Sequence, residues 1–332
     1  MYNTLKTLCL IPSVSGREKA VREKINELIA PYTDSVYTDN LGNLVAVKYG
    51  SSENKKKIML CAHMDEIGFL ATYIEDSGFI RIATVGGINL VASSFSEVVS
   101  ERGVKGVLVP DASVKAADFA PDKFVIDVGA KNKKEAERKV KIGDFFVVRP
   151  SLSKLSGKRV CGRPIDDRIG CAILIEIAKS YARSKPKHDI YFTFSSQEEV
   201  GCRGAKTASF GISPDYALIF DVTGTGDSVG AKPMECALGR GAAIKIKDSS
   251  VICHAELVEQ LKELAEKKNI PYQLEILTYG GTDTSSVQMS GLGTRAGALS
   301  IPTRYIHSSV ETFDMADAEA CKALTLEFIE NL

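Results

Sequence analysis

The sequence has no tryptophan, only four histidines and no two cysteines in a CxxC spacing. Its eight cysteines are scattered singly, which indicates reduced thiols in a cytoplasmic protein rather than a disulfide framework or a zinc knuckle. Basic and acidic residues balance at 42 each, so no positive excess indicates nucleic acid or a membrane surface as a partner. No apolar run approaches the ~20 residues that a helix needs to span a bilayer.

What is present is the composition of a globular protein, with 44% hydrophobic and 25% charged residues among 332. A chain of this length exceeds one ordinary core, so about two domains are expected. Between residues 69 and 150, short β-like runs such as "GFIRIATV" and "DFFVVRP" alternate with charged turns, and only "KKEAERKV" favours a helix. Strands and helices alternate on both sides of this segment. The pattern predicts an α/β core interrupted by an all-β insert.

Local patterns predict individual elements of the core. Ser15 and Glu18 have the spacing of a capping box at the start of a helix. The stretch "SVYTDNLGNLVAVKYG" favours a hairpin that turns at residues 39–43, and "KKKIMLCAHMDE" predicts a buried strand over residues 58–62. His188 is expected on the surface and His254 at a helix start, so neither is a candidate ligand.

Acidic residues and histidines follow the buried strands of the predicted core. The apolar run "IMLCAH" ends at a histidine, "IYFTFSS" is followed by two glutamates, and "YALIFD" ends at an aspartate. In open α/β sheets, binding sites form beyond the carboxyl ends of the strands, so these side chains are expected at one site. The set of candidates is His63, Asp65, Asp166, Asp167, Glu198, Glu199, Asp221 and His307.

This mixture of imidazole and carboxylate groups favours a divalent metal site. Such donors suit Zn²⁺, Co²⁺ or Mn²⁺, and a bridging carboxylate can hold two ions ~3.5–4 Å apart. A metal pair also accounts for the adjacent glutamates, because one can be a ligand while the other acts as general base. Taken singly, each group has an ordinary alternative, such as a helix cap for "DDR" or a solvated turn for the glutamates.

At these residues the chain resembles the glutamyl-aminopeptidase and tetrahedral (TET) aminopeptidase family of co-catalytic dinuclear metallopeptidases. The matching stretches follow the family's order from residue 62 to residue 311: "AHMDEIGF", "IDDRIG", "SQEEVGCRGA", "FDVTGTGD", "GGTDTSS" and "IPTRYIHSSVE". The resemblance implies a phosphorylase/hydrolase-like α/β core, with helices on both faces of a mixed sheet, and a small PDZ-like β-barrel insert. The implied domains are 1–67 and 153–332 for the catalytic part, and 68–152 for the insert, which serves oligomerisation.

The resemblance also implies a role for each candidate residue. Glu198 would be the general base, and Asp65 would orient a histidine ligand from behind. Two divalent ions per subunit, Zn²⁺ or Co²⁺ with Mn²⁺ as a further option, would be held by His63, Asp166, Glu199, Asp221 and His307, with Asp166 as the bridge. The peptide bond between Asp166 and Asp167 is expected to be cis. The implied reaction removes the N-terminal residue from short peptides with metal-activated water, and no residue is assigned to the substrate's α-amino group.

Members of this family commonly assemble into dodecamers through the β insert. In this chain the stretch "GVLVPDASVKAADFAPDKFVID" looks shortened and lacks the histidine-containing segment of that pattern, so either a dodecamer or a dimer is expected. Three other functions remain open on the residues: a deacylase or carboxypeptidase of the same fold, a glycosidase that uses paired carboxylates, and a non-catalytic metal-stabilised binding protein. The lack of tryptophan disfavours the glycosidase, and the spare glutamate disfavours the binding protein.

Overall fold

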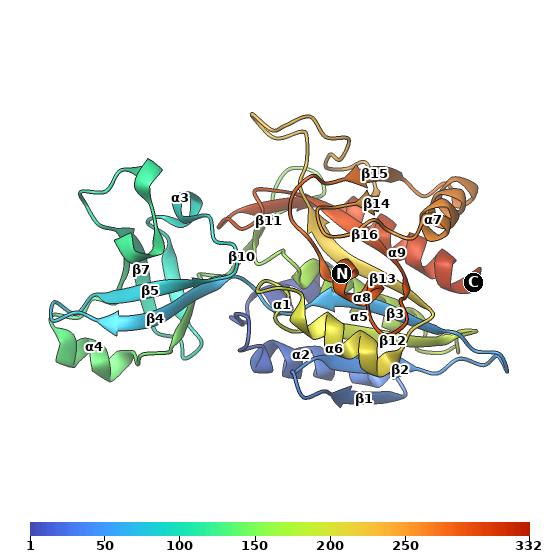
Figure 1. Cartoon of the computed structure of the whole chain (residues 1–332), viewed down its shortest axis with the longest axis horizontal. Coiled ribbons are helices and arrows are strands. Elements are labelled where there is room, and N and C mark those ends of the chain that lie inside the picture. Colours follow the sequence, from blue (N-terminus) through green and yellow to red (C-terminus); the bar gives the residue numbers. More distant parts are fainter.

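A computed structural model describes all 332 residues of the chain. The molecule consists of a large α/β core and a β-barrel that projects from one end of it (Figure 1). The first and last parts of the chain build the core together, and the barrel comes from the middle of the sequence. This arrangement confirms the predicted fold class, an α/β core with a small all-β insert.

The core contains an eleven-stranded sheet. Its main path runs, in spatial order, through β1 (Ser35–Thr38), β2 (Leu44–Lys48), β12 (Asp189–Ser195), β3 (Lys57–His63), β13 (Tyr216–Thr223), β16 (Arg295–Arg304), β17 (Glu311–Asp314), β11 (Arg159–Arg163) and β10 (Ser151–Lys154). Two further strands, β14 (Ala242–Lys247) and β15 (Tyr272–Ile276), extend from β16. The central strands β12, β3, β13 and β16 are parallel, so their carboxyl ends share one edge of the sheet.

Helices cover both faces of this sheet, because alternate residues of each central strand point to opposite sides. On β3, Ile58 and Leu60 belong to the larger hydrophobic cluster, whereas Met59 and Cys61 belong to a smaller one on the other face. The larger cluster takes in residues of α1 (Tyr2–Cys9), α2 (Lys19–Ile29), α5 (Arg168–Ser180), α7 (Ala255–Lys268) and α9 (Met315–Glu330). The smaller cluster takes in residues of α6 (Arg203–Ile212) and α8 (Asp283–Gln288).

The barrel is closed by six strands and has a hydrophobic core of its own, with 14 buried residues. In spatial order these strands are β4 (Gly68–Ile74), β5 (Ile80–Val85), β8 (Phe124–Asp127), β7 (Lys105–Pro110), β6 (Glu97–Ser100) and β9 (Phe145–Val148). The predicted helix is α4 (Lys133–Lys139), and a short helix that the sequence did not indicate, α3 (Leu90–Ser93), precedes β6. None of the chain's helices is both long and apolar enough to cross a membrane.

Two local predictions are wrong. Ser15 does not cap α2, whose N-cap is Glu18 without a side-chain cap, because the Ser15 hydroxyl instead donates to Asp65 at 2.6 Å. His188 is not on the surface: it is 3% exposed, and its Nδ1 accepts a hydrogen bond from the amide of Lys56, the residue before β3. The hairpin of β1 and β2 is confirmed.

Candidate active site

The carboxyl ends of the parallel strands bring most of the predicted site residues together. β3 ends at His63, which lies opposite Ser195, the last residue of the neighbouring strand β12. The two glutamates follow in the turn after Ser195. Asp221 lies near the end of β13, on the other side of β3, although this strand continues two residues beyond the predicted end. The sheet register therefore determines which polar side chains meet.

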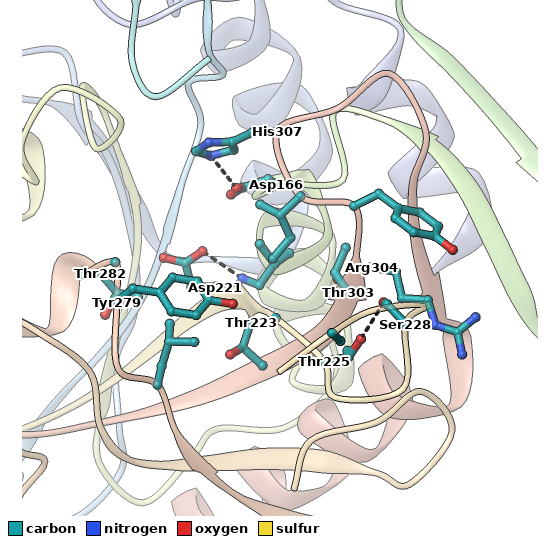
Figure 2. Close-up of a pocket in the computed structure, with 18 of the residues that line it drawn as sticks. Asp166, Asp221, Thr223, Thr225, Ser228, Tyr279, Thr282, Thr303, Arg304 and His307 are labelled. Carbon is teal, nitrogen blue, oxygen red and sulfur yellow. Dashed lines mark hydrogen bonds and ion pairs between the residues drawn. The ribbon is translucent and has the colours of Figure 1, made fainter. Parts of the chain in front are cut away.

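Asp166 lies between the two histidines. Its Oδ1 is 3.0 Å from Nε2 of His63 and its Oδ2 is 3.2 Å from Nε2 of His307. Figure 2 shows His307 directed at this carboxylate. A carboxylate with one oxygen facing each imidazole has the arrangement that a bridging ligand between two ions requires. The peptide bond from Asp166 to Asp167 is cis, as predicted.

Each histidine has a second carboxylate partner. Oε2 of Glu199 is 3.3 Å from Nε2 of His307, and Oδ1 of Asp221 is 3.9 Å from Nε2 of His63. The cluster thus has two halves, one with His63 and Asp221 and the other with His307 and Glu199, and Asp166 is shared. Donor atoms of His63, Asp166 and Glu199 all lie within 4.8 Å of one another.

Asp167, the neighbour of the bridging candidate, has a different position. Its Oδ1 accepts the Gly170 amide at 2.9 Å and so caps the N-terminus of α5, and its Oδ2 accepts the His63 amide at 3.3 Å. Both oxygens are used within the protein, and the side chain is fully buried. Asp167 therefore holds the backbone of a histidine instead of facing the cluster.

Asp65 links three parts of the site and is fully buried. Its backbone carbonyl lies 3.2 Å from Nδ1 of His63, and its Oδ1, 3.6 Å from the same nitrogen, accepts the Glu198 amide at 3.0 Å. Its Oδ2 accepts the Glu199 amide at 3.2 Å and the Ser15 hydroxyl. Asp65 thereby contacts the imidazole through its backbone carbonyl, and its carboxylate holds the turn that carries both glutamates. A group behind a histidine ligand sets the ring's orientation and tautomer, and this role of Asp65 stays a prediction.

Glu311 was not predicted as a functional residue, although it lies within a matching stretch. It is 1% exposed, and its Oε2 accepts the amides of Ile165 and Asp166 at 2.6 and 3.2 Å. Its Oε1 accepts the His307 amide at 3.0 Å. His307 has a φ of 63°. Residues other than glycine seldom adopt this left-handed backbone conformation, so surrounding contacts must maintain it. Glu311 thus holds the backbones of two candidate ligands in place.

The barrel segment also contributes to the site. The carbonyl of Gly87, in the loop between β5 and α3, lies 2.7 Å from Nδ1 of His307. This contact leaves Nε2 free to face the carboxylates. Gly86 has a φ of 78°, and a Cβ atom there would lie 2.6 Å from Ile67 and 3.2 Å from Glu199. Only a glycine lets this loop approach the cluster so closely.

The electrostatics of the cluster suit a bound cation. Burial is the largest effect that raises the pKa of Glu198, Glu199 and Asp221, and neighbouring carboxylates raise it further. Carboxylates held this close together become stable as anions when a divalent ion lies between them. Imidazole nitrogens and carboxylate oxygens are the donors that Zn²⁺, Co²⁺ and Mn²⁺ accept, so the residues present fit such ions.

A cavity of about 610 Å³ opens beside the cluster. Glu198 lines it together with the cluster, and its far wall carries hydroxyl groups and apolar side chains (Figure 2). The guanidinium of Arg304 is paired with Asp227, at 2.6 Å between Nη2 and Oδ2. Apart from the cluster, the wall residues are Val222, Thr223, Thr225, Ser228, Val229, Leu277, Tyr279, Thr282, Thr303 and Ile306, among others.

Comparison with known proteins identifies the family. Residues 42–324 match the M42 glutamyl aminopeptidases, and the chain belongs to this family. A lysyl aminopeptidase of Pyrococcus furiosus is 33% identical, with 100% of this chain and 97% of the relative covered. The solved aminopeptidase APDkam598 of the archaeon Desulfurococcus kamchatkensis has a TM-score of 0.94 at 36% identity, covering 99% of this chain and 94% of its own.

A second solved structure adds information about assembly. The Pyrococcus horikoshii TET1 peptidase, which can form a tetrahedron or a large octahedral shell, has a TM-score of 0.88 at 35% identity. The match covers 100% of this chain and 99% of the peptidase. The chain is therefore a peptidase of the aminopeptidase class, as the resemblance implied, and the deacylase alternative is not favoured.

Proposed function

We propose that this chain removes the N-terminal residue from short peptides by means of two divalent metal ions. His63 and Asp221 would hold one ion, His307 and Glu199 the other, and Asp166 both. The observation that carries this proposal is the position of Asp166, which has one oxygen toward each histidine at 3.0 and 3.2 Å. When bound, such ions lower the pKa of water and polarise the scissile carbonyl.

Glu198 is the proposed general base. Its carboxylate lines the cavity beside the cluster, and its backbone amide is held by Asp65 at 3.0 Å. Burial raises its pKa above the ordinary range for glutamate, the direction that favours a general base. Glu198 accepts the proton of the attacking water and then delivers it to the leaving amine.

The cavity wall supports a preference among substrates. Its hydroxyl and apolar groups match uncharged side chains, because the charge of Arg304 is already neutralised by Asp227. A lysine or glutamate side chain of a substrate would find no free partner of opposite charge among the wall residues beyond the cluster. We therefore expect neutral N-terminal residues to be cleaved fastest, whereas relatives are named for lysyl and glutamyl substrates.

Assembly, cellular location and domain roles extend the proposal. The TET1 peptidase can assemble into a tetrahedron or a large octahedral shell, which supports a homo-oligomer here, either dodecamer or dimer. We further propose a cytoplasmic enzyme in which residues 1–67 and 153–332 form the catalytic domain and residues 68–152 form the oligomerisation insert. Light scattering on the purified protein separates a dimer from a dodecamer directly.

Glu198→Gln tests the proposed mechanism. The amide keeps the shape of the side chain but cannot take a proton, so peptide hydrolysis should fall by ~10²–10⁴-fold. The content of the two catalytic ions and the thermal unfolding should stay close to the wild-type values, because Glu198 is not among the proposed ligands of that pair. Glu263→Gln, on the exposed face of α7, is the matched control. Hydrolysis that survives in Glu198→Gln at the control's level would overturn the proposed role.

A further inference from the structure

Beside the proposed metal pair lies a second group of donor atoms, contributed by Glu198, Cys202 and Asp283. One donor atom from each of the three side chains lies within 4.8 Å of the other two. The Cys202 thiol donates to Oε1 of Glu198 at 3.2 Å. These residues come from two separate segments: the turn leading into α6, and the first residue of α8.

Asp283 shows that this group is not fully satisfied by the protein itself. Its side chain is 1% exposed, and its Oδ2 accepts the Ser195 hydroxyl at 2.5 Å. Its Oδ1 is buried without a hydrogen-bond partner. A buried carboxylate oxygen without a partner is costly, and burial raises the pKa of Asp283 to about 6. A cation that coordinates this carboxylate would remove the cost.

Solvent can reach the group. Cys202 and Glu198 are both partly exposed, and Thr282, the residue before Asp283, lines the cavity (Figure 2). Neither carboxylate forms an ion pair with a lysine or an arginine. Burial and the nearby carboxylates raise the pKa of the Cys202 thiol, so this thiol stays protonated unless a cation displaces its proton.

From these observations we propose a third cation site, formed by Sγ of Cys202 and the carboxylates of Glu198 and Asp283. One thiolate with two carboxylates suits Zn²⁺ or its softer analogue Cd²⁺, and not Mg²⁺ or Ca²⁺, which prefer oxygen alone. Binding releases the thiol proton to solvent as the sulfur–metal bond forms. The alternative is that Cys202 serves only as a hydrogen-bond donor to Glu198.

Occupation of this site inhibits the enzyme. A cation on Glu198 takes up the electron pair that would otherwise accept a proton from water, so excess zinc stops hydrolysis without displacing the ions of the main cluster. This consequence rests on the proposed function of Glu198. The binding of the cation does not, so binding and inhibition are measured separately.

The experiment is a Cd²⁺ titration of the metal-loaded protein, followed by the ultraviolet charge-transfer band of the cadmium–thiolate bond. Cys202→Ser is the test variant because serine keeps a hydrogen-bond donor to Glu198 but removes the thiolate ligand. Cys161→Ser is the matched control, because Cys161 is the one other cysteine that is not buried. Its thiol donates to the backbone carbonyl of Val310 and not to a carboxylate of the site. Asp283→Asn is a second variant, which removes a carboxylate without changing the cysteine.

Wild type and Cys161→Ser should show one saturable cadmium–thiolate band that is absent in Cys202→Ser. Asp283→Asn should show the same band but need at least ~10-fold more Cd²⁺ to saturate it. In hydrolysis assays, each normalised to the same variant without added zinc, Cys202→Ser should need at least ~10-fold more Zn²⁺ for half inhibition. A band of equal size in Cys202→Ser and wild type would overturn the site. A Cys202-dependent band on a protein that hydrolyses no peptide would support the site while refuting the proposed function.

Discussion

Replacement of Glu311 by glutamine tests how the backbone of the site is held. The two carboxylate oxygens accept three amides, from Ile165, Asp166 and His307. A glutamine offers one oxygen and one NH₂ group. Whichever way it is oriented, an NH₂ donor then faces at least one amide donor in a place that solvent hardly reaches, since Glu311 is 1% exposed.

The size of the effect follows from these contacts. Each buried amide that loses its acceptor costs about 1–3 kcal/mol, so Glu311→Gln should lower the free energy of unfolding of metal-free protein by about that amount. Two of these amides belong to Asp166 and His307, which are proposed ligands. The third belongs to Ile165, the residue before Asp166. Loss of a residue that orients ligands typically weakens metal binding ~10–100-fold, which corresponds to about 1.4–2.7 kcal/mol.

The assay is a titration of metal-stripped protein with Zn²⁺ against a chromophoric chelator, together with urea unfolding of the same samples. Glu263→Gln on the surface of α7 should behave as wild type in both. If Glu311→Gln binds zinc as tightly as wild type, the three amide contacts do not position the ligands. This conclusion holds even if the variant is less stable than wild type.

Two further predictions concern buried charges outside the cluster. Lys245 lies fully buried, 3.3 Å from Asp248 and 2.6 Å from Glu275, so Lys245→Met should lower the free energy of unfolding by ~3–5 kcal/mol in urea unfolding. The surface change Lys262→Met should alter it little, and equal effects would contradict the prediction. Burial raises the pKa of Asp317 to about 6, so the folded protein keeps a proton that the unfolded chain loses near pH ~4. The stability of wild type relative to Asp317→Asn should therefore be highest below pH ~4 and fall by on the order of 2–3 kcal/mol as the pH rises to ~7, and a flat difference would refute this.

The ends of the buried strands were the most predictable part of the site. "IMLCAH" and "YALIFD" are apolar runs that stop at a charged or titratable residue, and parallel pairing brings such ends to one edge. This pattern was enough to predict that His63 and Asp221 lie at the same site. The β insert was also predictable, because short alternating runs with frequent turns differ visibly from the helix-rich flanks.

Contacts between distant segments were not predictable from local patterns. Ser15 has the spacing of a capping residue, but its hydroxyl instead bonds Asp65, 50 positions away. Glu66 looks like another loop carboxylate next to Asp65. It is buried 3.6 Å from both Arg163 and Arg168, so its charge is balanced within the protein.

The contribution of the barrel loop was missed for the same reason. Gly86 and Gly87 carry no side-chain chemistry that a motif could reveal. Their role follows from a close approach of the backbone to His307 and Glu199, which only the folded arrangement shows. The loop indicates that the insert shapes the site as well as extending the molecule.

The central claim is that the chain is a metal-dependent aminopeptidase, and hydrolysis of paired aminoacyl-anilides tests it most directly. Each compound is supplied with a free and with an acetylated N-terminus, in leucyl, lysyl and glutamyl forms. The assay is run on chelator-stripped protein before and after Zn²⁺, Co²⁺ or Mn²⁺ is restored. We predict metal-dependent cleavage of the free-amine compounds alone, with the leucyl form fastest. Cleavage of the acetylated compounds, or of free-amine compounds at an undiminished rate by stripped protein, would contradict the account.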